Sequence, residues 1–250
     1  MKKKEDFFAK VREIFAENSL SEYMTDEMLE KFYALTGIMI ETNEKMNITA
    51  ITDEDAIIAR HFADSLLLLR ADIESGAKVC DIGCGGGFPS FPISIARPDI
   101  TVMGVDSTAK KIAYVNETAK KLGLKNLTAI SGRAEDISAT GGEYREKFDL
   151  VCARAVAALP ILSELCLPFV KVGGRFVALK SKTADEELAD SKKGIELLGG
   201  KIEKIEKLTL IDHTLEDGSE AERTLITVRK VAKTPPKYPR AYAQIKKKHL

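Results

Sequence analysis

The stretch that decides the fold is Val79-Cys80-Asp81-Ile82-Gly83-Cys84-Gly85-Gly86-Gly87-Phe88-Pro89. It begins as a short apolar strand, reaches an acid at Asp81 and runs directly into a glycine-rich turn. Glycine tolerates positive φ angles and lets a ligand approach where a Cβ would collide. A strand that leads into such a turn at the start of an α/β unit is typical of a nucleotide-type cofactor site.

The spacing of the glycines narrows the choice of cofactor. A dinucleotide fingerprint reads G-x-G-x-x-G, whereas this turn reads G-x-G-x-G, and Phe88 occupies the place of the third dinucleotide glycine. The spacing therefore disfavours a nicotinamide oxidoreductase. With Asp81 two residues before Gly83, the run resembles motif I of the S-adenosylmethionine (SAM) methyltransferases.

Composition describes an ordinary globular protein and leaves a nucleic-acid partner open. The 250 residues are 44% hydrophobic and 30% charged, enough for a sizeable core. The net charge is zero, but residues 229–250 contain eight Lys or Arg and no acid, so the remainder carries −8. No signal peptide and no run near the ~18 apolar residues of a membrane span are found, so we expect a cytoplasmic protein.

The cysteines do not indicate a metal or redox motif. Cys80, Cys84, Cys152 and Cys166 form no C-x-x-C pair, which disfavours a zinc or thioredoxin-type site. Cys80 and Cys152 fall in apolar strand-like runs, where a buried thiol packs as a small hydrophobe. We expect no metal.

Periodicity predicts an α/β fold with a helical extension before it. Residues 5–70 read as helices, with start signals at Thr25-Asp26-Glu27 and Thr52-Asp53-Glu54-Asp55. Strands and helices then alternate, which predicts a doubly wound, mostly parallel sheet of seven strands closed by an antiparallel hairpin. Strands are expected over 79–81, 101–106, 127–130, 148–153, 175–179, 201–210 and 223–231, and helices over 91–96, 108–122, 157–170 and 184–198.

This pattern divides the chain into three parts. The N-terminal helical extension covers 1–70, the sheet domain covers 71–232 and a basic tail covers 233–250. The tail interleaves lysines with Tyr238 and Tyr242, which suits phosphates and stacking on unpaired bases, although a solubilising disordered tail is the alternative.

Polar residues follow the strands at the sheet edge where ligands of such folds bind. Asp106 ends the second strand and is placed to accept hydrogen bonds from both ribose hydroxyls; a helix cap is the alternative. Ser107 and Thr108 follow it and suit either role. Ala134-Glu135, after the third strand, are expected at the adenine edge, unless this is a solvated loop.

Arg154 follows the fourth strand, beside the presumed methyl site. Arginine there can hold a carboxylate or phosphate bidentately; a structural ion pair is the alternative. His61, beside Arg60 and Asp64, suits an RNA phosphate or a helix contact equally, and a lone histidine near acids is not a metal site.

Two missing motifs bear on the chemistry. After the fourth strand the chain reads Cys152-Ala153-Arg154-Ala155, without the Asn/Asp-Pro-Pro-aromatic motif of exocyclic-amine methyltransferases. Cys152 lacks the context of a pyrimidine-attacking nucleophile. Both absences favour an acceptor atom that already has a free lone pair, such as guanine N7, for which no catalytic base is required. We therefore assign none.

Eight motifs together resemble one family. In chain order they are Asn43-x-x-x-Asn47-Ile48-Thr49-Ala50, Arg60-His61-Phe62-x-Asp64-Ser65-Leu66, the glycine run, Val105-Asp106-Ser107-x-x-Lys110-Lys111, Gly132-Arg133-Ala134-Glu135-Asp136, Arg154-Ala155-Val156-Ala157, Gly173-Gly174-Arg175-Phe176-Val177-Ala178-Leu179-Lys180 and Lys237-Tyr238-Pro239-Arg240. They resemble the bacterial ribosomal RNA small-subunit methyltransferase G family, also called glucose-inhibited division protein B.

The resemblance implies a function and a set of contacts. It implies a class I, Rossmann-like SAM-dependent methyltransferase that is monomeric and methylates N7 of one guanosine in 16S rRNA near the decoding centre, on a ribosomal particle or its precursor. Cofactor contacts are expected at Gly83, Gly85, Phe88, Asp106, Ser107, Thr108, Ala134, Glu135 and Arg154. Contacts with the RNA are expected at Asn47, Arg60, His61, Lys180 and Arg240.

The chain departs from the family pattern at two places. Ser90 stands where the family often has glycine, and Ala243 and His249-Leu250 replace a glycine and a near-terminal Pro-Leu in the tail. The alternatives to an RNA methyltransferase are a SAM enzyme acting on a small molecule and a non-catalytic rRNA-binding assembly factor. Deleting residues 240–250 is expected to lower RNA activity while SAM binding stays.

Overall fold

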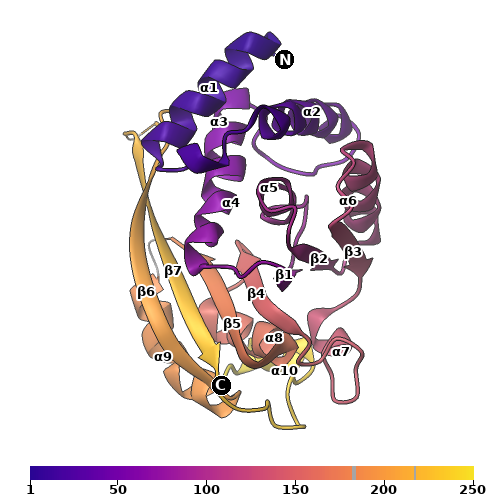
Figure 1. Ribbon diagram of the computed structural model, residues 1–250. Helices are drawn as coiled ribbons and strands as arrows, with labels where there is room; N and C mark the ends of the chain where they lie inside the picture. The colour runs from indigo at the N-terminus through magenta and orange to yellow at the C-terminus, as the bar shows by residue number, and fades with distance from the viewer. Residues whose placement is uncertain (182–183, 217) are drawn as a thin grey trace.

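The computed structural model describes residues 1–181, 184–216 and 218–250, and over these ranges seven strands form one mixed sheet (Figure 1). The strand order is β3-β2-β1-β4-β5-β7-β6. The strands are β1 (Lys78–Ile82), β2 (Thr101–Asp106), β3 (Leu127–Ser131), β4 (Phe148–Arg154), β5 (Val170–Lys180), β6 (Gly200–Ile211) and β7 (Glu220–Lys230). The first five pair in parallel, and β7 pairs antiparallel with both β5 and β6. The predicted sheet and its closing hairpin are confirmed.

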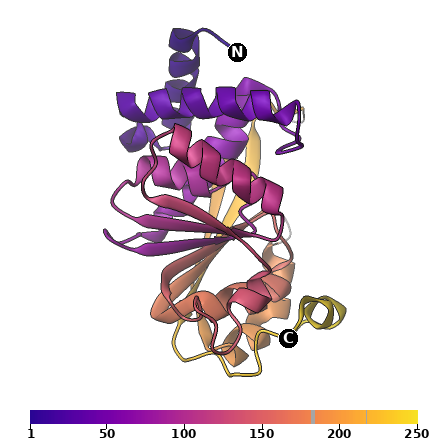
Figure 2. The same cartoon turned by 90° about the vertical axis from the view of Figure 1, so that its right-hand side faces the viewer.

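Helices cover both faces of this sheet, as Figure 2 shows. One face carries the N-terminal helices, α5 and α6, and the other carries α7 to α10. The α-helices are α1 (Lys4–Glu17), α2 (Asp26–Asn43), α3 (Glu54–Ile57), α4 (Asp64–Leu66), α5 (Ser90–Ala96), α6 (Ala109–Lys121), α7 (Ala134–Ile137), α8 (Leu159–Cys166), α9 (Ala184–Leu197) and α10 (Tyr242–Lys247). A π-helical turn, Ile58–Ala63, joins α3 to α4, and 3-10 turns lie at Ser21–Tyr23, Leu67–Ala71 and Leu167–Phe169.

The alternation of side chains along the strands builds two cores. In β1, Val79 belongs to the core under the N-terminal helices, and its neighbour Cys80 belongs to the core under α8 and α9. Successive strand residues point to opposite faces, so a strand covered on both sides is apolar throughout. The fully buried Phe15 and Phe32 share the first core with Val79, so the N-terminal helices and the sheet are packed as one unit.

Helix starts follow the predicted capping chemistry. Thr25 caps α2 by accepting a hydrogen bond from the Met28 amide at 3.3 Å. Asp53, one residue beyond the Thr52 position that a capping box assigns, caps α3 by accepting from the Ala56 amide at 2.9 Å.

The helix expected over 157–170 is shorter than predicted. The α-helix α8 ends at Cys166, a 3-10 turn containing Pro168 follows, and β5 begins at Val170. Proline has no amide hydrogen and cannot continue the helical ladder. Gly173 and Gly174 therefore lie inside β5 and do not terminate the helix, which corrects the sequence-based boundary.

The basic tail is an ordered strap. Arg145 donates to the carbonyl oxygens of Thr234 and Tyr238, at 2.8 and 2.9 Å. Arg240 forms a two-pronged ion pair with the fully buried Glu164 of α8, with Nη2 to Oε2 at 2.6 Å. Ile245 of α10 is fully buried. The alternative of a disordered tail is therefore not supported.

Removing the cation of the buried pair should destabilise the fold. Arg240→Met removes the cation that pairs with the Glu164 carboxylate and leaves the amide of residue 240 as a donor to it, so the free energy of unfolding should fall by about 2 kcal/mol or more. The expected loss is smaller than the ~3–5 kcal/mol for breaking a fully buried ion pair, because the Arg240 side chain is partly exposed. Urea unfolding measures it, with Lys247→Met on the exposed side of the strap as the control. A change within about 0.5 kcal/mol in Arg240→Met would refute this anchoring role.

Candidate active site

The glycine turn after β1 has no room for a side chain at Gly83, Gly86 and Gly87. The amides of Gly83 and Cys84 both donate to the Val105 carbonyl oxygen of β2, at 2.8 and 3.1 Å. At Gly83, which has φ +73°, a Cβ would lie 2.5 Å from Val156. The turn is thus held against β2 on one side and the segment after β4 on the other.

Asp106 joins the glycine turn to the start of α6. Its Oδ2 accepts a hydrogen bond from the Gly85 amide at 3.1 Å, and its Oδ1 accepts from the Thr108 amide at 2.8 Å. Thr108, not Asp106, is the N-cap residue of α6. Each carboxylate oxygen keeps a further lone pair, so Asp106 can still accept hydrogen bonds from a ligand.

One pocket of about 270 Å³ gathers five of the nine predicted cofactor residues. Its lining is Ile82, Gly83, Val105, Asp106, Ser107, Gly132, Arg133, Ala134, Glu135, Val156, Leu165 and Tyr242. Gly85 and Thr108 adjoin it through their bonds to Asp106. The sequence analysis did not place Val156, Leu165 and Tyr242 in this pocket, although Val156 belongs to one of the eight motifs.

The other two predicted cofactor residues, Phe88 and Arg154, belong to a neighbouring aromatic and charged cluster. The ring of His61 stacks on Phe88, with centroids 4.3 Å apart and planes 14° from parallel. Arg154 lies 5.9 Å from the Phe88 centroid and 3.3 Å, through Nη2, from His61 Nδ1. His61 Nε2 lies 2.8 Å from the Thr49 hydroxyl oxygen.

Asp64 holds two arginines in this cluster. Its Oδ2 accepts from Arg154 Nη1 at 2.8 Å, and its Oδ1 accepts from Arg223 Nε at 2.6 Å. Arg154 Nη1 also donates to the Arg60 carbonyl oxygen at 2.8 Å. The ion pair considered for Arg154 therefore exists, and it ties the π-helical turn to the carboxyl end of β4.

His61 is held neutral. Burial and the charges of Arg154 and Arg60 lower its pKa to about 3. Since Arg154 is a donor only, Nδ1 accepts its hydrogen bond and the ring proton sits on Nε2, facing Thr49. At 8% exposure His61 is a packing residue, and of its two proposed roles the helix contact is the one that the geometry favours.

Two buried polar atoms near the turn lack partners among the described residues. They are Asp81 Oδ1, an acceptor, and Arg154 Nε, a donor. Burial raises the pKa of Asp81 to about 6, while Ser90 donates to Oδ2 at 2.5 Å and Arg154 offsets part of the shift. Ser90, the departure from the family pattern, thus supplies a hydrogen bond to Asp81. Ammonium and carboxylate groups, as in the methionine part of SAM, are complementary to these orphaned atoms.

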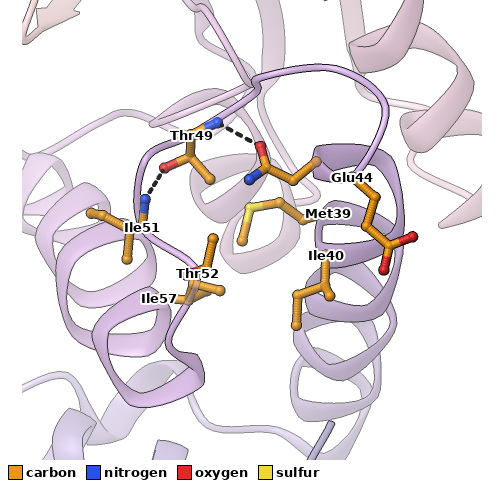
Figure 3. A pocket seen from close by; sticks show the side chains of 8 residues that line it. Met39, Ile40, Glu44, Thr49, Ile51, Thr52 and Ile57 are labelled. Atoms are coloured by element: carbon orange, nitrogen blue, oxygen red, sulfur yellow. Dashed lines mark hydrogen bonds between the residues drawn. The ribbon is translucent and has the colours of Figure 1, made fainter.

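The loop 43–51 packs against the glycine turn and braces it. Asn43 Oδ1 accepts from the amides of Ile48 and Thr49, at 2.8 and 3.1 Å. A Cβ on Gly86 would lie 2.5 Å from Ile48, so the loop rests directly on the turn. Figure 3 shows Thr49 with its hydroxyl accepting from the Ile51 amide, at the edge of a mostly apolar pocket between α2 and the 49–57 segment. That pocket contains none of the predicted cofactor residues.

Most predicted RNA contacts have internal partners. Arg60 donates to Asp212 at 2.6 Å, Lys180 pairs with Glu187 at 2.7 Å, and Arg240 pairs with Glu164. His61 is buried, whereas Asn47 is exposed in the brace loop. The sequence does not show which acid pairs with which cation. Asp212 and Glu164 lie far along the chain from their partners, and Glu187 is one of three consecutive acids shortly after Lys180, so these pairs were not foreseen.

Two negative findings apply to the described part of the chain. There, no group of three or more His, Cys, Asp or Glu side chains is arranged to hold a metal ion. Nor does any helix in it combine the length and apolarity needed to cross a bilayer.

The fold, glycine turn and Asp106 pocket define a class I SAM-dependent methyltransferase. Solved structures share the fold: the [4+2]-cyclase SpnF has a TM-score of 0.54 at 16% identity, covering 83% of this chain and 97% of its own. Geranyl diphosphate C-methyltransferase from Streptomyces coelicolor, solved with S-adenosylhomocysteine, has a TM-score of 0.51 at 17% identity. The match covers 68% of this chain and 79% of that enzyme.

Sequence comparison identifies the family. The model of the GidB family, rRNA small subunit methyltransferase G, matches residues 28–233. Relatives called ribosomal RNA small subunit methyltransferase G include one from Lactobacillus delbrueckii, 45% identical over 91% of this chain and 95% of its own. Another, from Clostridium novyi, is 40% identical over 98% of each. The chain belongs to the rRNA small subunit methyltransferase G family.

A side chain at Gly85 should block the cofactor. Gly85 has φ +52°, and a Cβ there meets only the Gly83 carbonyl oxygen at 3.8 Å, so Gly85→Val projects into open space at the turn. We expect SAM affinity to fall at least about tenfold by calorimetry. Gly76→Val is the matched control, because Gly76 also has positive φ and open space but lies before β1. Equal SAM affinities for both variants would count against the site.

The buried His61 should make stability sensitive to acid. Its folded pKa of about 3 lies below the unfolded value near 6.5, so its stabilisation is present above pH 6.5 and is lost as the pH falls towards 3. The stability difference between the wild type and His61→Gln should shrink by about 2 kcal/mol from pH 7 to pH 5. Urea titrations measure this, with the exposed His213→Gln as control. A pH-independent difference would contradict the burial of a neutral ring.

Proposed function

We propose that this protein transfers the methyl group of SAM to N7 of one guanosine in 16S rRNA, near the decoding centre. Membership of the rRNA small subunit methyltransferase G family is the observation that carries the proposal. The gathered pocket of Gly83, Asp106, Ala134 and Glu135 supports it independently. Monomeric action in the cytoplasm and chemistry without a metal ion complete the proposal.

The chain's own residues would hold the two ends of the cofactor. Asp106 would accept from the ribose hydroxyls, and the Ala134-Glu135 backbone would face the adenine edge. At the other end, Asp81 and Arg154 offer a buried acceptor and a buried donor to the ammonium and carboxylate. Bound there, SAM supplies an electrophilic methyl group on a sulfonium.

Guanine N7 carries a free lone pair and no proton, so the methyl transfer requires no catalytic base. The work left to the protein is orientation of the acceptor and stabilisation of charge. Cys152 is fully buried in β4, and burial raises its thiol pKa, so it is neither accessible nor nucleophilic. This supports direct transfer over a covalent cysteine mechanism.

RNA would meet the enzyme through exposed cations and the brace loop. Within the described chain, Lys233, Lys237 and the run Lys246–Lys248 are exposed and form no ion pair. These lysines suit phosphate contacts, and Asn47 is exposed on the loop over Gly86. For Arg60, His61, Lys180 and Arg240, direct contact with RNA stays a prediction, because their internal partners would have to be shared or exchanged.

The direct test is methylation of small ribosomal subunits that lack N7-methylguanosine. With labelled SAM, nucleoside mass spectrometry should find N7-methylguanosine at a single rRNA position. Deproteinised 16S rRNA serves as a second substrate, and Cys152→Ala should retain most of the activity. Methylation at carbon or an exocyclic amine, or no transfer to either substrate, would overturn the proposal.

A further inference from the structure

The cofactor pocket has a wall from the far end of the chain. Tyr242, the first residue of α10, lines the same pocket as Gly83, Asp106 and Glu135. It is half-buried and packs against the core under α8 and α9. Figure 1 shows α10 beside α8, on the face of the sheet away from the N-terminal helices.

The strap that carries Tyr242 is fastened to the elements that form the adenosine side of the pocket. Arg145 Nη1 donates both to the Ser138 carbonyl oxygen, at the end of α7, and to the Tyr238 carbonyl oxygen of the strap, at 2.8 and 2.9 Å. Helix α7 begins with Ala134 and Glu135, which line the pocket. These bonds fix the position of the strap relative to α7, whose first two residues form the predicted adenine edge.

A second contact, also before Tyr242 in the chain, ties the strap to α8. Arg240 is paired with Glu164, and the next residue of α8, Leu165, lines the pocket. Beyond α10, the chain end packs on α9, where a Cβ on Gly194 would lie 3.0 Å from Leu250. Tyr242 is thus anchored before and after, and its place in the wall is set by contacts that do not involve RNA.

We propose that Tyr242 is a cofactor-binding residue that contacts the adenosine moiety of SAM and of its product. An aromatic ring beside the apolar Val156 and Leu165 suits the flat face of a purine, whereas Asp106 and Glu135 are polar groups for its ribose and edge. This rests on the proposed cofactor site and changes the expectation for the tail. Deleting residues 240–250 should weaken SAM binding as well as RNA activity, because it removes a pocket wall and leaves Glu164 unpaired.

Calorimetry of the full-length protein with two probes tests this. S-adenosylhomocysteine and 5′-methylthioadenosine share the adenosine group, but only the first carries the amino-acid end. Since stacking of a base on an aromatic ring is worth ~1–3 kcal/mol, Tyr242→Ala should weaken the binding of both probes by about 5- to 150-fold, and by similar factors for the two. Tyr242→Phe should bind both as the wild type does.

Two controls separate a binding role from damage to the strap. Lys247→Ala, on the same helix but outside the pocket lining, should leave both affinities unchanged. Tyr242→Leu should keep the ligand-free melting temperature near the wild-type value, yet bind both probes more weakly than the wild type does. Wild-type affinity in Tyr242→Ala, or in Tyr242→Leu, would overturn the proposal. No RNA enters these measurements, so an error in the RNA substrate cannot imitate either result.

Discussion

Three glycines of the turn after β1 have no room for a side chain, and the arrangement of the site depends on that constraint. Three glycines of the turn face three different elements: Gly83 meets Val156 after β4, Gly86 meets Ile48 of the brace loop, and Gly87 meets Phe91 of α5. A Cβ at any of them would lie within 2.5 Å of its neighbour. The sheet, the N-terminal layer and the first helix of the domain therefore take their positions from the same short stretch of backbone.

A largely buried charge network ties the N-terminal helices to the residues beside the glycine turn. Asp64 binds Arg154 at the end of β4 and Arg223 of β7, while Arg60 reaches Asp212 after β6. Arg60 and His61 belong to the π-helical turn and Asp64 to α4, and the neutral ring of His61 stacks on Phe88. Breaking one partner of such a pair leaves a costly unpaired charge. The helical layer thus holds Arg154 and Phe88 in place beside the glycine turn.

Local pattern was enough to predict the sheet and the core of the pocket. The seven-stranded, mostly parallel sheet, its closing hairpin and the meeting of Gly83, Asp106 and Ala134 follow from alternation and from the rule that parallel strands end at one edge. The helix over 157–170 was too long, because the pattern of apolar residues continues through Pro168 into β5. What could not be predicted is which acid neutralises which cation. Arg240 and Lys180 look like free RNA-binding residues until Glu164 and Glu187 are brought beside them by the fold.

A crystal structure of the protein with S-adenosylhomocysteine tests the central claim most directly. We predict that the ribose hydroxyls hydrogen-bond to Asp106, with the adenine between the Ala134-Glu135 segment and the wall formed by Val156, Leu165 and Tyr242. The amino-acid end should lie towards Asp81 and Arg154. A ligand bound in the apolar pocket between α2 and the 49–57 segment, or one that leaves Asp106 without a contact, would contradict the account.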